Sequence, residues 1–254
     1  MNPSASPAAS IPQVLLYNVY ETLVKMAPTG TLKPLLAQEW DVSSDRTVYT
    51  FQLNPAARFA SGSPVNAQAV VTSFNRIKTE STIQAPLVEQ MAVVKSTEAV
   101  DDHTVKVTLS RPSNLWLFDM SSTAGIIYDP NALATLDTTP SGSGPFVLKQ
   151  WNKGQSVVLA SSGSYWGTAP RLDSVTFRYF TDPNAMNAAM LAGDLDVISN
   201  LQNPDAIDQF SDTGRFTVTQ GTTTGEVVMA LNLSLIHISE PTRRTPISYA
   251  VFCL

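Results

Sequence analysis

The sequence predicts an α/β protein built from β-hairpins and amphipathic helices. Residues 49–53 alternate apolar and more polar side chains, which is the period of a strand with one buried face. Residues 67–77 instead place apolar side chains at helical spacing, directly behind Asn66, whose side chain suits an N-cap. A further alternating hairpin spans residues 146–159 around a Lys-Gly turn. Strands and helices therefore mix along one chain, as they do in the α/β class.

Local signals place the other elements in chain order. Asp182 before Pro183 combines an N-cap with proline at the first helical position, and Gly193 ends that helix. The expected elements are a helix over 14–24, a hairpin over 40–53, a helix over 66–77, a weaker helical or extended stretch over 87–94, a strand over 105–109, a short apolar helix or loop over 115–118, a hairpin over 146–159, a strand over 175–179, a helix over 182–193, a strand over 194–198, a short helix over 203–210 and a strand over 227–231.

The composition is that of a globular chain with an acidic balance. Of 254 residues, 43% are hydrophobic and 15% are charged, and the formal net charge is −5. This balance disfavours a nucleic-acid or anionic-membrane partner. No apolar run approaches the ~20 residues of a membrane-spanning helix. The one cysteine, Cys253, excludes an internal disulfide framework. The first residues have neither the basic region nor the apolar core of a signal peptide.

Two groups of titratable residues are candidates for a metal site or for acid–base catalysis, but a structural role is the favoured interpretation of both. His103 follows Asp101 and Asp102, which suggests a metal site or an acid–base pair. Adjacent residues in a turn point in different directions, and zinc needs further ligands from elsewhere, so a solvated β-turn is favoured. Asp194 and Asp196 share one face of an expected strand. They follow a glycine, so a helix-to-strand turn is the favoured interpretation there.

The glycine-rich segment Gly142-Ser143-Gly144 does not predict catalysis either. It is too short for a phosphate loop and lacks the Lys-Ser/Thr that follows one. It also lacks the spacing of a nucleophile elbow. Because no serine has a paired base, the sequence predicts that the chain is not an enzyme and needs no metal or cofactor.

Short motifs occur in the order and at the spacing found in one known family. The turn and helix from Arg58 to Ile77 resemble the signature of the extracellular solute-binding proteins, family 5, in which an aromatic residue leads into a Gly-x-Pro turn and a helix with a Val-Val pair. Ala69 departs from the family, which often has an acidic capping-box residue there. The other matches are Asn2-Pro3, Tyr17–Val24, Gly142–Phe146, Tyr165-Trp166-Gly167, the Ala-rich helix after Asp182, and Gly193–Asp196.

The resemblance covers residues 2–232 and implies a type II periplasmic binding protein-like fold. In that fold two α/β lobes close on a ligand at a hinge. This chain would supply most of the first lobe: residues 1–20 and 139–232 would form its mixed-sheet core, and residues 21–138 a smaller inserted α/β subdomain. Relatives carry a first strand and a secretory or lipoprotein signal before their Asn/Asp-Pro pair, so the chain looks truncated at its beginning, and the second lobe would lie beyond its end.

The resemblance further implies a transport function. The whole protein would capture peptides or related solutes in the periplasm or outside the cell and deliver them to the membrane permease of an ABC importer. It would act as a monomer, free or anchored to the cytoplasmic membrane as a lipoprotein. Nickel chelates and oligosaccharides are alternative ligands within the family. From another class, an extracytoplasmic sensor or adhesion module is the alternative, which a fused kinase or anchor domain would favour.

The loop after the Asn/Asp-Pro pair contacts the ligand in this family. It maps onto Ser6, Pro7, Ala8 and Ala9 of this chain. Open backbone groups in such a loop are able to pair with an extended peptide as a neighbouring strand would. A frayed terminus is the alternative interpretation of the same residues.

Two further places are candidate ligand contacts. Trp116 is a candidate pocket wall, because an indole covers a side chain without demanding a particular one. Ordinary core packing is the alternative for this residue. Gly142, Ser143 and Gly144 are candidate contacts on the hinge side. The acidic group that often pairs with a peptide's amino terminus belongs to the other lobe and has no counterpart to assign.

From Leu233 the sequence no longer follows the family. Residues 233–243 resemble a translated transposase-type sequencing adapter, and residues 247–254 resemble the distal adapter, with the sample barcode between them. A divergent native terminus is the alternative. Residues 233–254 are thus predicted to be a non-native tail, so His237 and Cys253 carry no functional argument.

Overall fold

The computed structural model describes residues 1–219 apart from residues 7, 9 and 202. The chain divides into two compact units, Met1–Thr181 and Asp182–Leu254. The strand predicted over 227–231 and the predicted non-native tail lie outside the described residues.

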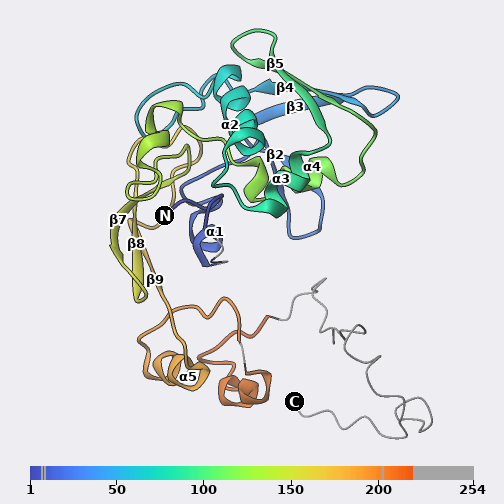
Figure 1. Cartoon of the computed structure of the whole chain (residues 1–254). Helices are drawn as coiled ribbons and strands as arrows, with labels where there is room; N and C mark the ends of the chain where they lie inside the picture. Colours follow the sequence, from blue (N-terminus) through green and yellow to red (C-terminus); the bar gives the residue numbers. More distant parts are fainter. Residues whose placement is uncertain (7, 9, 202, 220–254) are drawn as a thin grey trace, which may run out of the picture. The chain divides into compact units, whose positions relative to one another are not determined.

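An antiparallel four-stranded sheet dominates the middle of the first unit. Its order is β3-β4-β6-β5, with β3 at Ala37–Val42, β4 at Val48–Leu53, β5 at Val94–Ala99 and β6 at Thr104–Leu109. In β4 and β6 every second residue is buried, because one face of the sheet packs against helices. Figure 1 shows helix α2 (Ala67–Thr79) beside these strands, and α2 contacts both β5 and β6. The predicted hairpin and the predicted strand over 105–109 are confirmed.

Helix α2 begins where the sequence predicts, because its N-cap is formed by a side chain. The Asn66 Oδ1 accepts a hydrogen bond from the Ala69 amide at 3.0 Å. The turn before the cap is held by a buried carboxylate: the Ser61 hydroxyl donates to Asp129 Oδ2 at 2.6 Å. Asp129 also accepts from the Asn131 amide at 3.0 Å, which caps the short helix that follows. One fully buried carboxylate thus joins the signature turn to a distant helix start.

The remaining elements between the first helix and the last sheet are short. They are β1 (Val24–Met26), β2 (Leu32–Pro34), α3 (Ala85–Met91), α4 (Trp116–Asp119), and the 3₁₀ helices η1 (Thr123–Gly125) and η2 (Pro130–Thr135).

The helix predicted over 14–24 is wrong beyond its first residues. Helix α1 spans Ser10–Leu15, and Tyr17 then adopts a left-handed φ of 63° that ends it. The apolar spacing behind the prediction reflects burial, but the backbone after residue 16 bonds to distant segments. For example, the Val19 carbonyl accepts from the Gly144 amide at 2.9 Å. Such tertiary hydrogen bonds replace the helical ones.

A second antiparallel sheet follows, in the order β7-β8-β9. Strand β7 spans Phe146–Asn152, β8 spans Ser156–Ser161, and β9 spans Ser174–Arg178. The predicted hairpin over 146–159 and the predicted strand over 175–179 are confirmed. Among the described residues, β7 pairs with β8 alone, so β7 is an edge strand of this sheet.

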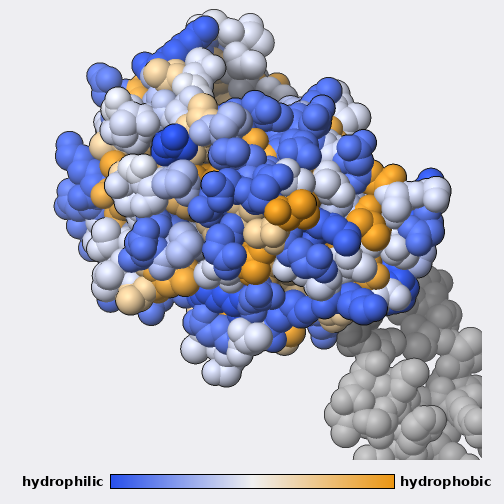
Figure 2. Space-filling model, turned by 90° about the horizontal axis from the view of Figure 1, so that it is seen from above, coloured by the Kyte–Doolittle hydropathy of each residue, from blue (hydrophilic) through white to orange (hydrophobic). Residues whose placement is uncertain are grey.

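Two hydrophobic clusters form the core of the first unit. The buried residues of one lie within residues 23–127, and those of the other join residues 1–20 to residues 126–159. Ile126, Tyr128 and Leu136 belong to the second cluster, although the sequence analysis assigns them to the inserted subdomain. The predicted boundaries at residues 20 and 138 stay a prediction. On the outside, Figure 2 shows hydrophilic residues over most of the face seen from above, with apolar residues scattered among them.

The second unit contains helix α5 (Pro183–Ala192) and the 3₁₀ helix η3 (Pro204–Phe210). The predicted cap and stop of α5 are both present: Asp182 accepts from the Asn184 amide at 2.9 Å, and Gly193 has a φ of 85°. The strand predicted over 194–198 is wrong, since those residues pair with no strand in the described part of the chain. A strand forms only where a neighbouring backbone completes its hydrogen bonds. All pairings in the three sheets of the described residues are antiparallel.

Replacing the N-cap of α2 tests this account of the signature turn. Asn66→Ala removes the acceptor for the Ala69 amide, so we expect the free energy of unfolding to fall by about 1 kcal/mol. Urea denaturation followed by circular dichroism measures the change. The matched control is Asn75→Ala on the exposed face of the same helix, which we expect to change stability by less than about 0.5 kcal/mol. Equal losses in the two variants would contradict the cap.

Candidate functional site

The residues predicted to contact a ligand fall in three separate places. Ser6 lines a cavity of about 770 Å³. Gly142, Ser143 and Gly144 are buried where the chain crosses the segment after α1, and we call these three residues the crossover segment. Trp116 lies inside the first core cluster. Of the remaining loop residues, Ala8 is exposed, while residues 7 and 9 lie outside the described part of the chain.

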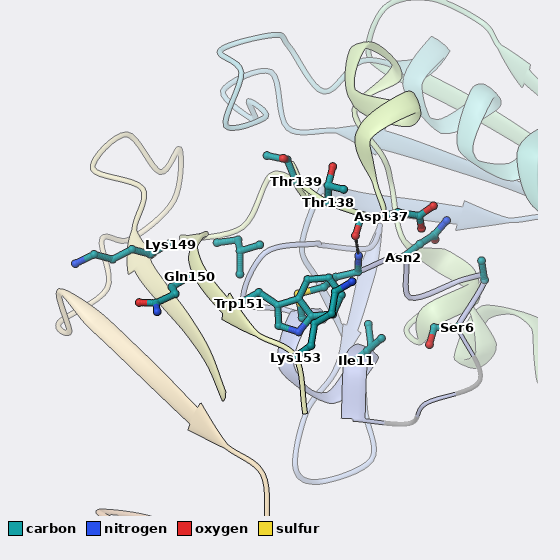
Figure 3. Close-up of a pocket in the computed structure, with 13 residues that line it drawn as sticks. Asn2, Ser6, Ile11, Asp137, Thr138, Thr139, Lys149, Gln150, Trp151 and Lys153 are labelled. Carbon is teal, nitrogen blue, oxygen red and sulfur yellow. Dashed lines mark hydrogen bonds between the residues drawn. The ribbon is translucent and has the colours of Figure 1, made fainter. Parts of the chain in front are cut away.

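The cavity beside Ser6 has three walls, which Figure 3 shows in close-up. The N-terminal loop and α1 form one wall, the segment after η2 forms the second, and strand β7 with its turn forms the third. Trp151 offers an indole surface, and the ammonium of Lys153 lies 5.0 Å from the centre of that ring. The lining residues are Met1, Asn2, Ala5, Ser6, Ile11, Asp137, Thr138, Thr139, Leu148, Lys149, Gln150, Trp151 and Lys153.

The chemistry of the cavity suits a polar solute of modest size. Hydroxyl, amide and ammonium groups surround one aromatic ring, a mixture that orients a ligand while covering its apolar parts. Lys149 lies where the register of β7 against β8 shifts between Leu148 and Gln150. Such bulges re-aim side chains and are frequent beside binding sites.

A buried polar network around Ser4 holds the N-terminal loop that carries Ser6. The Ser4 hydroxyl lies 2.8 Å from the Tyr128 hydroxyl and accepts from Arg76 Nη1 at 3.0 Å. The Arg76 guanidinium lies 4.9 Å from the centre of the Tyr128 ring and 2.5 Å from a Glu80 oxygen. Burial raises the pKa of Tyr128 to about 12, so its hydroxyl remains a hydrogen-bond donor at neutral pH.

A glutamine side chain fixes the same loop from another direction. The side-chain amide of Gln84 donates to the Ser6 carbonyl at 2.6 Å and to the Pro3 carbonyl at 3.3 Å. The Gln84 backbone amide donates to the Ser4 carbonyl at 3.0 Å. Three hydrogen bonds from one residue therefore hold the loop as far as Ser6, which fits a positioned loop better than a frayed one.

The crossover segment passes the residues after α1 at backbone contact distance. The Gly144 amide donates to the Val19 carbonyl at 2.9 Å. A Cβ added to Gly142 would lie 2.0 Å from the Val19 oxygen, and one added to Gly144 would lie 2.5 Å from the Asn18 oxygen. Glycine is required at both positions because backbone atoms, which cannot rotate away, occupy that space.

Two motifs that are distant in sequence meet beside the crossover segment. Glu21, from the Tyr-Glu motif, accepts hydrogen bonds from the Tyr165 hydroxyl at 2.6 Å and from Trp166 Nε1 at 3.1 Å. Burial raises the pKa of Glu21, and the hydrogen bonds from Tyr165 and Trp166 oppose that shift. Burial also raises the pKa of Tyr165, helped by the neighbouring carboxylate.

Trp116 packs in the core rather than along the cavity. Its side chain is 1% exposed, and its ring lies 4.8 Å from that of Tyr49 and 6.3 Å from that of Phe51. This arrangement agrees with the core-packing alternative, and a role as a pocket wall stays a prediction that this geometry does not favour.

Several positioning residues had weak sequence signals or none. Glu21 and Trp166 stand in motifs that carry the family resemblance, yet no local pattern shows that these motifs meet. The contacts of Gln84 and Arg76 with the N-terminal loop have no local signal, because Ser6 and Ser4 lie 78 and 72 positions away. Within the described residues, no group of three or more potential ligands is placed to hold a metal ion. No helix in that part of the chain has the length and apolar character needed to cross a membrane.

Substituting the glycines of the crossover segment tests its close packing. We expect Gly142→Ala to lower the free energy of unfolding by about 3 kcal/mol, because the added Cβ meets fixed backbone atoms. Thermal or urea denaturation measures the loss. The matched control is Gly154→Ala, whose Cβ meets nothing within 4 Å and whose left-handed φ of 75° costs only about 1 kcal/mol. A smaller loss at Gly142 than at Gly154 would contradict the predicted contact.

Removing the hydroxyl of Ser4 tests the network under the loop. Ser4→Ala removes the buried hydrogen-bond partner of Arg76 Nη1 and of the Tyr128 hydroxyl, so we expect the free energy of unfolding to fall by about 2 kcal/mol. Tyr128→Phe and the double variant complete a thermodynamic cycle, in which the double variant loses less than the sum of the two single losses. Simple additivity, measured by denaturation, would show that the two hydroxyls do not act together.

The sequence matches a family described as bacterial extracellular solute-binding proteins, family 5, over residues 31–251. Among curated proteins, it is 29% identical over 248 residues to the probable D,D-dipeptide-binding periplasmic protein DdpA of Escherichia coli (strain K12), covering 92% of this chain and 47% of that protein. It is 30% identical over 190 residues to the glutathione-binding protein GsiB of Pectobacterium atrosepticum, covering 73% of this chain and 37% of that one.

Solved structures with the same fold include two at a TM-score above 0.7. NikA from Brucella suis, in complex with Fe(III)-EDTA, has a TM-score of 0.73 at 28% identity over 84% of this chain and 44% of that chain. The periplasmic binding protein DppA from Helicobacter pylori, in complex with the peptide STSA, has a TM-score of 0.74 at 26% identity over 82% of this chain and 46% of that chain.

These matches confirm the predicted type II periplasmic binding protein fold, of which the chain supplies a partial lobe. The chain spans about half the length, or less, of the curated relatives it matches. The family match extends over most of the chain, and several of the motifs that carried the resemblance lie at the crossover segment and the buried Glu21 contact. The chain therefore belongs to the bacterial extracellular solute-binding proteins, family 5.

Proposed function

We propose that the whole protein from which this chain derives captures small peptides outside the cytoplasm and delivers them to the permease of an ABC importer. The observation that carries this proposal is the family match over residues 31–251, together with relatives named for binding a D,D-dipeptide and glutathione. A peptide is the ligand chemistry that these two relatives share. The protein acts as a monomer, binds no nucleic acid and catalyses no reaction.

The geometry of the N-terminal loop supports this function. Ser4 and Gln84 hold the loop in place up to Ser6, and Ser6 faces a cavity with polar walls and one indole. A preorganised loop binds an extended ligand with less loss of conformational freedom than a mobile one. Ser6, Pro7, Ala8 and Ala9 remain the proposed ligand contacts, with the crossover segment beside the hinge.

A nickel chelate is the second candidate ligand. The nickel-binding periplasmic protein of Escherichia coli (strain K12) is 27% identical over 244 residues, covering 92% of this chain and 46% of that protein. A chelate brings its own metal ligands, so it does not require a cluster of acidic or histidine side chains in this part of the protein.

Calorimetric titration of the protein from the uninterrupted gene tests the function. We expect di- to pentapeptides to bind with micromolar dissociation constants, about −8 kcal/mol, and nickel–histidine to bind more weakly. The 254-residue chain alone, which spans about half the length of its relatives or less, should reach only about millimolar affinity, or about −4 kcal/mol. The test is completed by measuring uptake of the same peptide into vesicles that carry the ABC importer permease encoded beside the gene of this protein.

Two results would overturn the proposal. If nickel–histidine bound more tightly than every peptide in the pool, the ligand assignment would be wrong. If no solute in either class bound the full-length protein, or if bound peptide never entered vesicles, the transport role would be wrong and a sensor or adhesion role would replace it.

A further inference from the structure

Glu21 is a buried carboxylate that does not line the proposed ligand cavity. Its side chain is 2% exposed. The hydroxyl of Tyr165 donates to Oε1 at 2.6 Å, and Nε1 of Trp166 donates to Oε2 at 3.1 Å. Both donors come from the loop between β8 and β9, so this carboxylate holds the loop against a segment 144 positions earlier in the sequence.

The indole of Trp166 has two acceptors at once. Its N–H points between Glu21 Oε2 at 3.1 Å and the Ser143 carbonyl at 3.0 Å. A shared donor of this kind transmits the position of one acceptor to the other, because moving either one breaks the alignment. The Glu21 carboxylate therefore reaches the middle of the crossover segment through a single aromatic ring.

The crossover segment needs such a support. Its two glycines leave no side chains to pack, and the carbonyl of Gly142 is also held by the Ala60 amide at 2.8 Å, in the turn before α2. Glycine has more conformational freedom in the unfolded chain than any other residue, so ordering it costs more entropy. Hydrogen bonds to its neighbours therefore decide how well the segment is ordered. The bond to the Ser143 carbonyl lies between the two glycines.

We propose that Glu21 and Trp166 are positioning residues for the crossover segment. The carboxylate orients the indole, and the indole N–H fixes the Ser143 carbonyl, so that Gly142 and Gly144 keep their contact with the backbone after α1. The bearing of these two residues on ligand binding rests on the proposed function. The contacts of Glu21 and Trp166 with the crossover segment, which we call the clamp, are measurable without any ligand. An experiment is therefore able to disprove the clamp without disproving the proposed function, and the reverse.

Protonation of Glu21 gives the clamp a direct signature. Burial raises the pKa of Glu21 above its ordinary value of 4.5, while the neighbouring side chains of Tyr165, Ser143, Trp166 and Lys25 favour the charged form. The folded state therefore holds the proton more tightly than the unfolded state does. This contribution to stability is fully present below the ordinary pKa and is lost as the pH rises through the folded-state pKa. Tyr165 stays protonated over this range, because its own pKa is raised.

The first experiment follows the indole N–H of Trp166 by ¹⁵N nuclear magnetic resonance of the full chain between pH 4 and 8. We expect its chemical shift to titrate with a pKa above 4.5 and to stop titrating in Glu21→Gln. Glu89→Gln, an exposed carboxylate on α3, is the matched control and leaves the titration unchanged. A Trp166 signal that does not titrate, or that titrates equally in Glu21→Gln, would overturn the proposal.

The second experiment measures amide hydrogen exchange at Gly144 and Phe146, which donate to Val19 and Asn18. We expect Trp166→Phe and Glu21→Ala to speed exchange there by about tenfold, relative to amides in β4 and β6. Glu21→Gln should restore most of the protection, because its amide is able to accept from the indole and donate to Tyr165.

Val107→Ala, in the first core cluster, controls for a general loss of stability. If Trp166→Phe changed exchange evenly over the chain, as Val107→Ala does, both residues would be ordinary structural contacts and the proposal would be wrong. Should Glu21→Ala not fold, Trp166→Phe and Glu21→Gln still decide the outcome, because they leave the buried volume nearly intact.

Discussion

The close passage of the crossover segment over the backbone after α1 is the constraint on which the first unit depends. A Cβ at Gly142 would lie 2.0 Å from the Val19 oxygen. The crossover segment and the backbone after α1 are therefore too close together to allow a side chain at this position. The carbonyls of Asn18 and Val19 accept from the distant amides of Phe146 and Gly144, so they are not available for helical hydrogen bonds after α1. The close passage also brings the start of β7 beside the N-terminal loop.

Buried polar groups surround this passage and hold it in place. Glu21 is satisfied by two donors from the β8–β9 loop, and the Asp129 carboxylate joins the signature turn to η2. Leaving any one of these partners unpaired would cost about 1–3 kcal/mol, whereas each satisfied pair adds only about 1 kcal/mol. Such networks therefore select one arrangement of the segments more than they add stability.

The sequence predicted where the candidate ligand loop lies, but it did not predict which residues hold that loop in place. The resemblance around the Asn-Pro pair predicted Ser6 as a ligand contact, and the structure places Ser6 at a cavity. Gln84, which holds the loop, could not be recognised from the sequence. A side chain that bonds a loop 78 positions away leaves no periodic pattern. Trp116 packs against Tyr49 in the core, which agrees with the core-packing alternative, and its role as a pocket wall stays a prediction.

By itself the sequence determined the family, the strands of the four-stranded and three-stranded sheets except β5, and the starts of α2 and α5, since these follow from alternation, caps and short turns within a few residues. Only the tertiary structure decided where α1 ends, that residues 194–198 form no strand in the described part of the chain, and that Glu21 meets Trp166. Each of these depends on a partner distant in the sequence. Local patterns report which face of a segment is buried, but the identity of the neighbour that completes its hydrogen bonds is fixed only when the chain folds.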